Sequence, residues 1–261
     1  MKSRGAERRI LAAALVLSVA AALLALGAGH AQEQRQTSGG KEAKMSAVEE
    51  VLSRMEWLGH DTFKIEAGGK RIYTDPYQLA GGPPADLILI THDHFDHCSP
   101  DDVAKIQNAG TTIVATRDCA AKLTGKVKTV APGDRLTVDG VEVEAVAAYN
   151  TNKKFHPQAN RWVGYIFTVQ GVRIYLAGDT DHIPEMKSYR CDIALLPVSG
   201  TYVMTAEEAA RAALDIQPQV AVPMHYGAIV GSAGDAKKFE QQLSGKVRVH
   251  VMSPKKGVGA P

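Results

Sequence analysis

The chain has 261 residues, of which 45% are hydrophobic and 22% charged, and this composition fits a globular protein with one core of ordinary size. Its formal net charge is +2, but residues 1–31 hold four of the 30 basic side chains and one of the 28 acidic ones, so the remainder carries 26 basic and 27 acidic residues. A nearly neutral body without an arginine-rich stripe argues against a nucleic-acid partner.

The N-terminus has the features of an export signal. Four basic residues among the first nine precede an uninterrupted apolar stretch over residues 10–28, which is followed by Gly29, His30 and Ala31. We therefore expect residues 1–31 to be a signal peptide cleaved after Ala31, and the protein to be periplasmic or secreted. The stretch is close to the roughly 20 residues that a membrane span needs, so an uncleaved anchor with membrane contact is the alternative.

The first half of the remaining chain predicts a linker followed by short strands. Residues 32–50 are polar and aperiodic, which predicts a flexible linker, and the folded domain is expected over residues 51–261. Strands are predicted over residues 56–58, 62–65, 71–74 and 87–90. Residues 101–109 predict a helix, because Ser99 fits its N-cap and Pro100 its first position.

Strands and helices alternate through the rest of the chain. We expect a helix over residues 117–123 and strands over residues 127–130, 135–138, 141–148, 163–169 and 172–176. Thr205 opens a further helix to Leu214, with Glu208 as its capping partner. A strand over 219–223, a helix over 235–243 and a strand over 247–251 complete the series. Two sets of strands with intervening helices predict an α+β fold in which sheet packs on sheet and helices lie outside.

Three histidines and two aspartates occur within one short segment, directly after the apolar strand predicted at residues 87–90. They are His92, Asp93, His94, Asp96 and His97. Imidazole and carboxylate groups suit Zn²⁺ and similar cations, and a loop that leaves a rigid strand lets alternate residues converge on one point. Uncoordinated histidines this close would repel one another on protonation, so the segment predicts a metal site.

Two later segments repeat the arrangement of an apolar strand that ends in a residue able to bind metal. Residues 172–177 lead through Gly178 to Asp179, and residues 220–224 lead to His225. Because both residues follow predicted strands, they are candidates for the rest of the metal site.

Three motifs in this order, at residues 92–97, 177–180 and 223–227, resemble the metallo-β-lactamase superfamily. Residues 57–60 (Trp-Leu-Gly-His) and 74–76 (Thr-Asp-Pro) resemble its compact branch of metal-dependent hydrolases, which is related to ascorbate-phosphate lactonase. The resemblance covers most of the predicted domain. It implies a four-layer αββα sandwich, the metallo-β-lactamase fold, with the metal site at one edge of the sheets.

The resemblance also implies ligands for two divalent metal ions, with Zn²⁺ expected and Mn²⁺ or Fe²⁺ as alternatives. His92 and His94 would bind the first metal, Asp96 and His97 the second, Asp179 would bridge both, and His225 would complete the second site. Each metal would thus be held by residues from distant parts of the chain.

One ligand of the first site is open. The family's third histidine matches Asn150 in this sequence, and asparagine is a weak zinc ligand. We expect His156 to take this place, because it is the only histidine between His97 and Asp179. His60, His182 and Tyr226 are expected to surround the ligands rather than to bind metal.

These assignments predict a metal-dependent hydrolase with a small-molecule substrate. The two cations would share a hydroxide that attacks a carbonyl or phosphoryl centre, and Asp96 would be the catalytic residue that orients it. A small ester, lactone or phosphodiester is expected. β-Lactam hydrolysis is ranked low, because an oxygen bridge from Asp179 resembles thioesterase, lactonase and phosphodiesterase members more closely. The alternative is a non-catalytic module that binds metal or a metabolite on the same fold.

Overall fold

The computed structural model describes residue 40 and residues 42–255. The predicted signal peptide over residues 1–31 therefore lies outside the described residues. Within the described part of the chain, no helix is both long enough and apolar enough to cross a membrane.

A helix replaces the second half of the predicted linker. Residues 42–53 are helical, and the compact unit of the chain begins at Ala47. The prediction of a flexible segment up to residue 50 is wrong here, because Val48, Val51 and Leu52 lie on one helical face and are buried in the core. Polar residues between these three positions hid the apolar stripe in the sequence.

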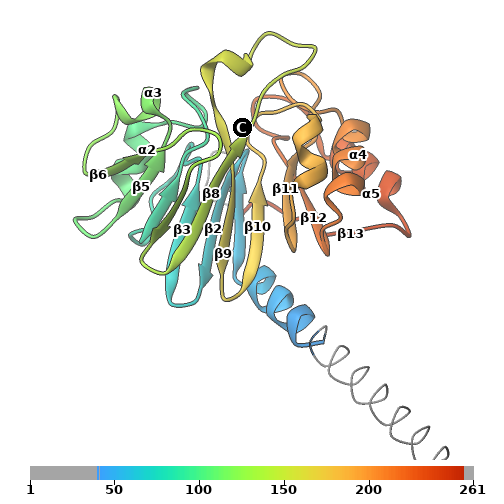
Figure 1. The fold of residues 1–261 in the computed structure, drawn as a ribbon, viewed down its shortest axis with the longest axis horizontal. Helices are drawn as coiled ribbons and strands as arrows, with labels where there is room; N and C mark the ends of the chain where they lie inside the picture. The colour runs from blue at the N-terminus through green and yellow to red at the C-terminus, as the bar shows by residue number, and fades with distance from the viewer. Residues whose placement is uncertain (1–39, 41, 256–261) are drawn as a thin grey trace, which may run out of the picture. The chain divides into compact units, whose positions relative to one another are not determined.

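Six strands form the first sheet, in the spatial order of the chain. They are β1 (Met55–Gly59), β2 (Thr62–Ala67), β3 (Lys70–Thr74), β4 (Leu87–Leu89), β5 (Thr112–Ala115) and β6 (Lys126–Thr129). The pairs β1–β2 and β2–β3 are antiparallel, whereas β3, β4, β5 and β6 run parallel to one another. The carboxyl ends of these four strands therefore lie at one edge of the sheet (Figure 1).

Seven strands form the second sheet, also in the order of the chain. They are β7 (Arg135–Val138), β8 (Val141–Ala147), β9 (Val163–Val169), β10 (Val172–Leu176), β11 (Ile193–Pro197), β12 (Val220–Met224) and β13 (Arg248–Val249). Strands β7 to β10 form an antiparallel meander, and β10 to β13 are parallel. The loops after β10, β11 and β12 consequently leave the sheet at a common edge.

Helices cover the outer faces of the two sheets. The first sheet carries α2 (Pro100–Ile106) and α3 (Arg117–Ala120), and the second carries α4 (Ala206–Ile216) and α5 (Ala233–Leu243), with 3₁₀ turns η1 (Gln158–Asn160) and η2 (Pro184–Ser188) in connecting loops. Ser99 accepts a hydrogen bond from the Asp102 backbone at the start of α2, as predicted. The predicted capping box of Thr205 and Glu208 at the start of α4 is also confirmed.

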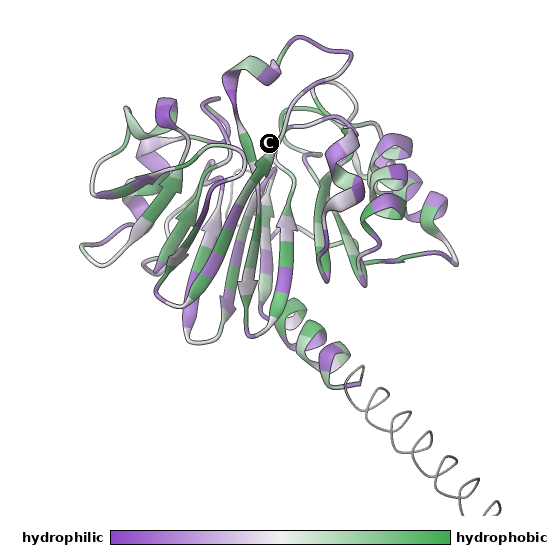
Figure 2. Ribbon diagram, in the orientation of Figure 1, coloured by the Kyte–Doolittle hydropathy of each residue, from purple (hydrophilic) through white to green (hydrophobic). Residues whose placement is uncertain are grey.

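The buried side chains confirm the α+β fold with its αββα layers. Leu87 and Leu89 point into the core between the sheets, while Ile88 and Ile90 point into a second core with residues of α2. Figure 2 shows hydrophobic and hydrophilic bands alternating along the strands, as expected where one face of a sheet differs from the other.

Two strands were not predicted from the sequence. β11 is buried at every position and lies between β10 and β12, and β5 is likewise buried throughout. β4 and β12 are also buried throughout and were predicted as continuous apolar runs, so burial alone does not separate the two missed strands from the predicted ones.

Candidate metal centre

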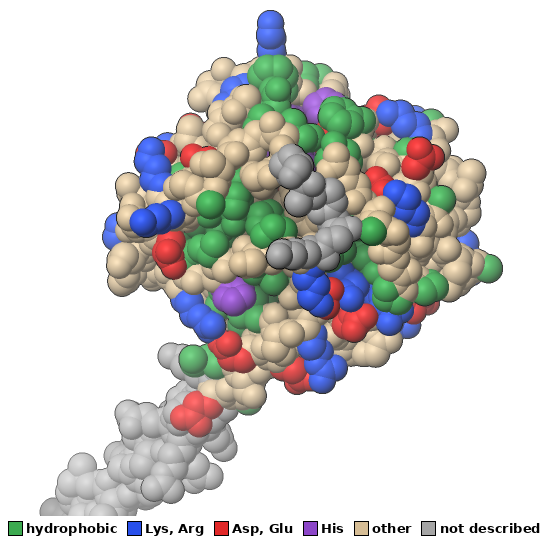
Figure 3. Space-filling model, turned by 180° about the vertical axis from the view of Figure 1, so that it is seen from behind, with side chains coloured by type: hydrophobic (Ala, Val, Ile, Leu, Met, Phe, Trp, Pro, Cys, Tyr) green, Lys and Arg blue, Asp and Glu red, His purple; other side chains and the backbone are tan. Residues whose placement is uncertain are grey.

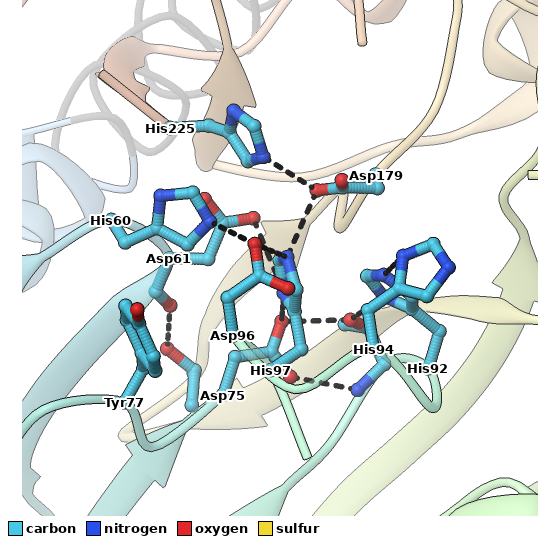
Figure 4. Close-up of polar contacts among 12 residues, drawn as sticks. His60, Asp61, Asp75, Tyr77, His92, His94, Asp96, His97, Asp179 and His225 are labelled. Carbon is cyan, nitrogen blue, oxygen red and sulfur yellow. Dashed lines mark hydrogen bonds and ion pairs between the residues drawn. The ribbon is translucent and has the colours of Figure 1, made fainter. Parts of the chain in front are cut away.

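The predicted ligands come from loops at the adjoining edges of the two sheets (Figure 4). The segment 92–97 follows β4 of the first sheet, and Asp179 and His225 follow β10 and β12 of the second. His156 lies in the loop between β8 and β9. Parallel strands bring these loops to one edge, which is where α/β proteins generally place their binding sites.

A close backbone contact joins the two edges. The Val163 amide donates a hydrogen bond to the Thr91 carbonyl oxygen over 3.2 Å. Gly178 has a positive φ of 62°, and a Cβ atom at this position would lie 2.9 Å from the Cβ of Thr91. Only glycine fits there without movement of the chain, so the residue before Asp179 determines how near that carboxylate comes to the histidine segment.

Three histidines and one oxygen of Asp179 form the first group of ligand atoms. His94 Nδ1 lies 3.0 Å from His92 Nε2 and 3.2 Å from His156 Nε2. Asp179 Oδ2 lies 3.2 Å from His156 Nε2. The structure thus brings His156, distant in the chain, beside His94 and Asp179.

Asn150, the alternative ligand, holds His156 instead of joining the group. Its side-chain oxygen accepts a hydrogen bond from the His156 amide over 2.9 Å and lies 3.2 Å from His156 Nδ1. Its side-chain nitrogen donates to the Tyr202 carbonyl and to Asp181 Oδ1. These bonds orient the imidazole so that Nε2 faces His94.

The other oxygen of Asp179 belongs to the second group of ligand atoms. Asp179 Oδ1 lies 3.3 Å from His97 Nε2 and 3.2 Å from His225 Nε2. Asp96 Oδ2 lies 3.8 Å from His97 Nε2 and 3.1 Å from His60 Nε2. The sequence analysis expected His60 to surround the ligands, and the structure places it against Asp96.

Polar groups behind the rings fix their orientation. Asp75 Oδ2 lies 2.9 Å from His97 Nδ1 and accepts a hydrogen bond from the Thr91 hydroxyl over 2.7 Å. The Ser199 hydroxyl lies 2.9 Å from His225 Nδ1. Each contact engages the outer ring nitrogen and leaves the inner one directed at Asp179, which is the usual arrangement around metal-binding histidines.

Backbone strain is concentrated at the same place. His60, Asp75 and His225 have φ angles of 50°, 34° and 60°, in the left-handed region that residues other than glycine rarely adopt. Strained backbone of this kind is common at functional sites, where the surrounding structure maintains it.

Burial and neighbouring charges give the ionisable groups different protonation states. Burial lowers the pKa of His92 well below its ordinary value, and the charge of His97 adds to this shift. Burial alone would also lower the pKa of His97, but the carboxylates of Asp179 and Asp75 outweigh it and raise that pKa well above the ordinary value. Burial alone would raise the pKa of Asp96, yet the hydrogen bond with a neighbouring histidine and the charge of His97 lower it to about 2. Ionised carboxylates therefore stand next to at least one neutral ring.

The donor atoms fit divalent cations. His97 Nε2, His225 Nε2 and Asp179 Oδ1 are buried and have no hydrogen-bond partner among the described residues. Two ligands of one tetrahedral zinc ion, each bound at about 2.0–2.1 Å, lie about 3.3 Å apart. The separations among the histidine nitrogens and the Asp179 oxygens, 3.0 to 3.3 Å, agree with this spacing, and Asp96 Oδ2 lies somewhat farther out, 3.8 Å from His97 Nε2. The donor set around Asp179 therefore fits divalent cations.

Several residues of the cluster were not recognised in the sequence. The Trp162 ring lies 5.0 Å from His92 and 4.8 Å from His94, and its Nε1 donates a hydrogen bond to Asp118 Oδ2 over 2.6 Å. The carboxylate of Asp61 is fully buried, lies 3.9 Å from His97 Nδ1 and has no hydrogen-bond partner among the described residues, and burial raises its pKa to about 7. Their positions at the carboxyl ends of strands or in adjoining loops are the only sequence feature that points to them.

The other two predicted neighbours contact different parts of the molecule. His182 Nε2 lies 2.9 Å from Asp215 Oδ2 at the end of α4, and Tyr226 packs on Trp57 with 4.7 Å between ring centroids. Tyr226 thus contributes to packing beside His225. None of the contacts described for His182 reaches the cluster.

Comparisons with known proteins agree with this geometry. Residues 54–225 match the family model of the beta-lactamase superfamily domain. A metal-dependent hydrolase of Thermococcus onnurineus is 35% identical over 221 residues, which cover 78% of this chain and 97% of the relative. A metal-dependent hydrolase of Aeropyrum pernix is 35% identical over 235 residues, which cover 78% of this chain and 96% of the relative.

Solved structures give the same result. A provisionally assigned metal-dependent hydrolase from Parabacteroides distasonis superposes with a TM-score of 0.70 and 35% identity, covering 77% of this chain and 93% of that one. Igni18, a metallo hydrolase from Ignicoccus hospitalis, superposes with a TM-score of 0.64 and 26% identity, covering 77% of this chain and 95% of that one.

Proposed function

The chain belongs to the beta-lactamase superfamily and is a metal-dependent hydrolase, and on this premise we propose that it cleaves a small ester, lactone or phosphodiester at the cluster around Asp179. The observation that carries the proposal is the division of this carboxylate, with one oxygen beside His156 and the other beside His97 and His225. A carboxylate placed between two groups of ligand atoms suits a two-metal hydrolytic site.

Two divalent ions held here, with Zn²⁺ favoured over Mn²⁺ or Fe²⁺, would supply a nucleophile at neutral pH and a Lewis acid for the developing negative charge. The side chains of the protein perform the positioning. Asp96 is ionised at neutral pH and has one oxygen held by His60, so its other oxygen is available to orient the attacking water. Burial lowers the pKa of His60 to about 4, so this ring positions Asp96 without adding a charge.

Aromatic side chains flank the ligand segments and support an organic substrate. Phe95, between His94 and Asp96, is 69% exposed and packs edge-on against Tyr77. Phe155, next to His156, is 44% exposed and packs against Tyr202. Figure 3 shows hydrophobic side chains around a histidine near the upper edge of the molecule. Apolar surface beside polar reactive groups is typical of small-molecule sites.

The test is hydrolysis by purified, metal-loaded protein of bis(p-nitrophenyl) phosphate, a panel of lactones and nitrocefin, each with and without a chelator. We expect chelator-sensitive turnover of the phosphodiester or a lactone, with nitrocefin a poor substrate. Asp179→Asn should abolish turnover, whereas Asp215→Asn, which alters a carboxylate paired with His182, should retain it. Lack of chelator-sensitive turnover with every substrate would favour the non-catalytic binding module.

We also propose that the hydrolase acts outside the cytoplasm, on the basis of the basic and apolar residues 1–31. N-terminal sequencing of protein recovered from fractionated cells tests this. A chain that begins at Gln32 in an exported fraction is expected, whereas an intact N-terminus in the membrane fraction would indicate an anchor.

A further inference from the structure

A pocket of about 730 Å³ lies beside the candidate metal centre. Its walls come from α3 with the residues on either side of it, the end of β6 with the loop that follows, and η1 with the residue after it. Because β4, β5 and β6 are parallel neighbours, these walls stand at the same edge of the first sheet as the segment 92–97. The volume is within the roughly 300–1,000 Å³ range of sites for small organic ligands.

One tryptophan connects the pocket to the histidines. Trp162 packs against His92 and His94, and its ring nitrogen donates a hydrogen bond to Asp118. Asp118 lines the pocket, as does Arg161, the residue before Trp162 in the chain. A chain of contacts thus runs from the pocket through the Asp118 carboxylate and the Trp162 ring to the first group of ligand atoms.

The acidic groups in the pocket wall are already engaged. Asp118 accepts hydrogen bonds from Trp162, from the Thr116 hydroxyl and from the Cys119 amide. Burial alone would raise the pKa of Asp118, but the hydrogen bonds with Thr116 and Trp162 lower it, so the carboxylate stays ionised. Asp134 accepts a hydrogen bond from the Ala131 amide over 2.8 Å. These carboxylates serve the local fold.

The basic groups of the same pocket have no such partners. Arg117 and Arg161 are exposed, and within the described part of the chain neither guanidinium group makes a hydrogen bond or an ion pair. Lys153, by contrast, lies in the neighbouring loop with its charge paired to Asp181 over 2.6 Å. Arg161 also has a positive φ of 55°, so the turn after η1 holds it in a strained conformation.

We propose that this pocket binds an anionic group of the substrate, a carboxylate or a phosphate, while the bond to be cleaved lies at the histidine cluster. Arg117 and Arg161 would bind the anion, because planar guanidinium groups form paired hydrogen bonds with carboxylate and phosphate oxygens. The inference rests on the proposed hydrolytic function and narrows its substrate class. The substrate is then an organic acid derivative rather than a neutral ester.

The kinetic test compares two esters with the same leaving group, neutral p-nitrophenyl acetate and anionic mono-p-nitrophenyl glutarate, at constant ionic strength. The double variant Arg117→Gln/Arg161→Gln should lower kcat/KM for the glutarate ester about tenfold or more, mainly through KM, and leave the acetate ester nearly unchanged. The control Lys126→Gln/Lys237→Gln removes the same charge outside the pocket and should leave the ratio of the two kcat/KM values as in wild type. If kcat/KM for the glutarate ester divided by kcat/KM for the acetate ester is the same in the wild type and in the arginine double variant, the proposal is wrong.

A binding measurement separates this inference from the hydrolytic function. Glutarate and methyl phosphate are titrated separately into the protein while tryptophan fluorescence is recorded, because Trp162 adjoins the pocket. We expect a saturable change in wild type and in the lysine control that is lost in the arginine variant, and the stronger titrant identifies the anion. Binding of this kind without hydrolysis of any ester would support the pocket and refute the proposed activity. Hydrolysis of an ester without saturable binding of either anion would support the proposed activity and refute the pocket.

Discussion

The two groups of ligand atoms that share Asp179 are supported in different ways. In the second group, buried His97 rests against the carboxylate of Asp75, and buried His225 rests against the hydroxyl of Ser199. In the first group, His156 belongs to a loop between strands and is held by the neutral amide of Asn150. A carboxylate behind a histidine increases its strength as a ligand, so we expect the second group to bind metal more tightly.

The two groups also differ in whether their supporting residues stand at the ends of strands or in a long loop. The residues behind the second group follow the ends of β3 and β11, which are paired strands within the sheets. The first group depends on the conformation of loop residues 148–162, which the strands only anchor at its ends. A chelator should therefore remove the first metal before the second.

The largest expected effect tests whether the two groups depend on one residue. Asp179→Ala removes both oxygens and should reduce bound metal to below about half of the wild-type content, because each group loses a charged ligand. Elemental analysis after gel filtration measures this, with Asp215→Ala as the control. A full metal complement in Asp179→Ala would show that the groups are independent of the shared carboxylate.

A smaller effect is expected when only the first group is altered. His156→Ala should reduce the metal content by about one of two equivalents, because the second group keeps its own ligands. Asn150→Ala should weaken metal binding less, since it removes only the support of that ring. The opposite order, with metal lost in Asn150→Ala and retained in His156→Ala, would make Asn150 the ligand.

Removal of the carboxylate behind His97 tests the source of the difference between the groups. Asp75→Asn keeps the shape of the side chain but not its charge, and should weaken metal binding at the second group about 10- to 100-fold. Competition with a chromophoric chelator measures the affinity of each step. If the weaker step changes instead of the tighter one, the assignment of the tighter site to the second group is wrong.

The smallest effect is expected from a substitution that lowers stability without changing metal binding at either group. Thr205→Ala removes the cap of α4, which lies on the outer face of the second sheet, and should cost about 1 kcal/mol of unfolding free energy. Urea denaturation measures the loss. Both metals should remain bound at their wild-type affinities, and a selective loss from one group would show that its support extends to this helix.

The sequence pointed to the site where residues able to bind metal directly follow predicted strands, in the segment 92–97 and at Asp179 and His225. Residues 92–97 stand in one segment after one strand, so their residue types alone indicated metal. Trp162 contacts His92 because the two sheets meet at their edges, and Ser199 contacts His225 because β11 and β12 are neighbours in the second sheet. Spacing along the chain carries no record of either contact.

The elements of the fold also differ in how clearly the sequence marks them. Strands with one exposed face, such as β8, show an alternating pattern and were found with nearly correct bounds. β4 and β12 are buried throughout and were predicted as continuous apolar runs, whereas β11, which is buried to the same extent, was missed. The helix over residues 42–53 has a core-facing stripe of only a few residues, and it becomes evident only from the core against which it packs.

At Gly178, the lack of a side chain determines how closely the two sheets approach each other, and hence where Asp179 lies. At this residue the end of one sheet rests on Thr91 of the other, and even a single added carbon would not fit. A methyl group there would push the Asp179 carboxylate away from the imidazoles, although none of the clustered side chains would be changed. When this enzyme is redesigned for a new reaction, Gly178 should therefore tolerate substitution less well than the side chains of the cluster do.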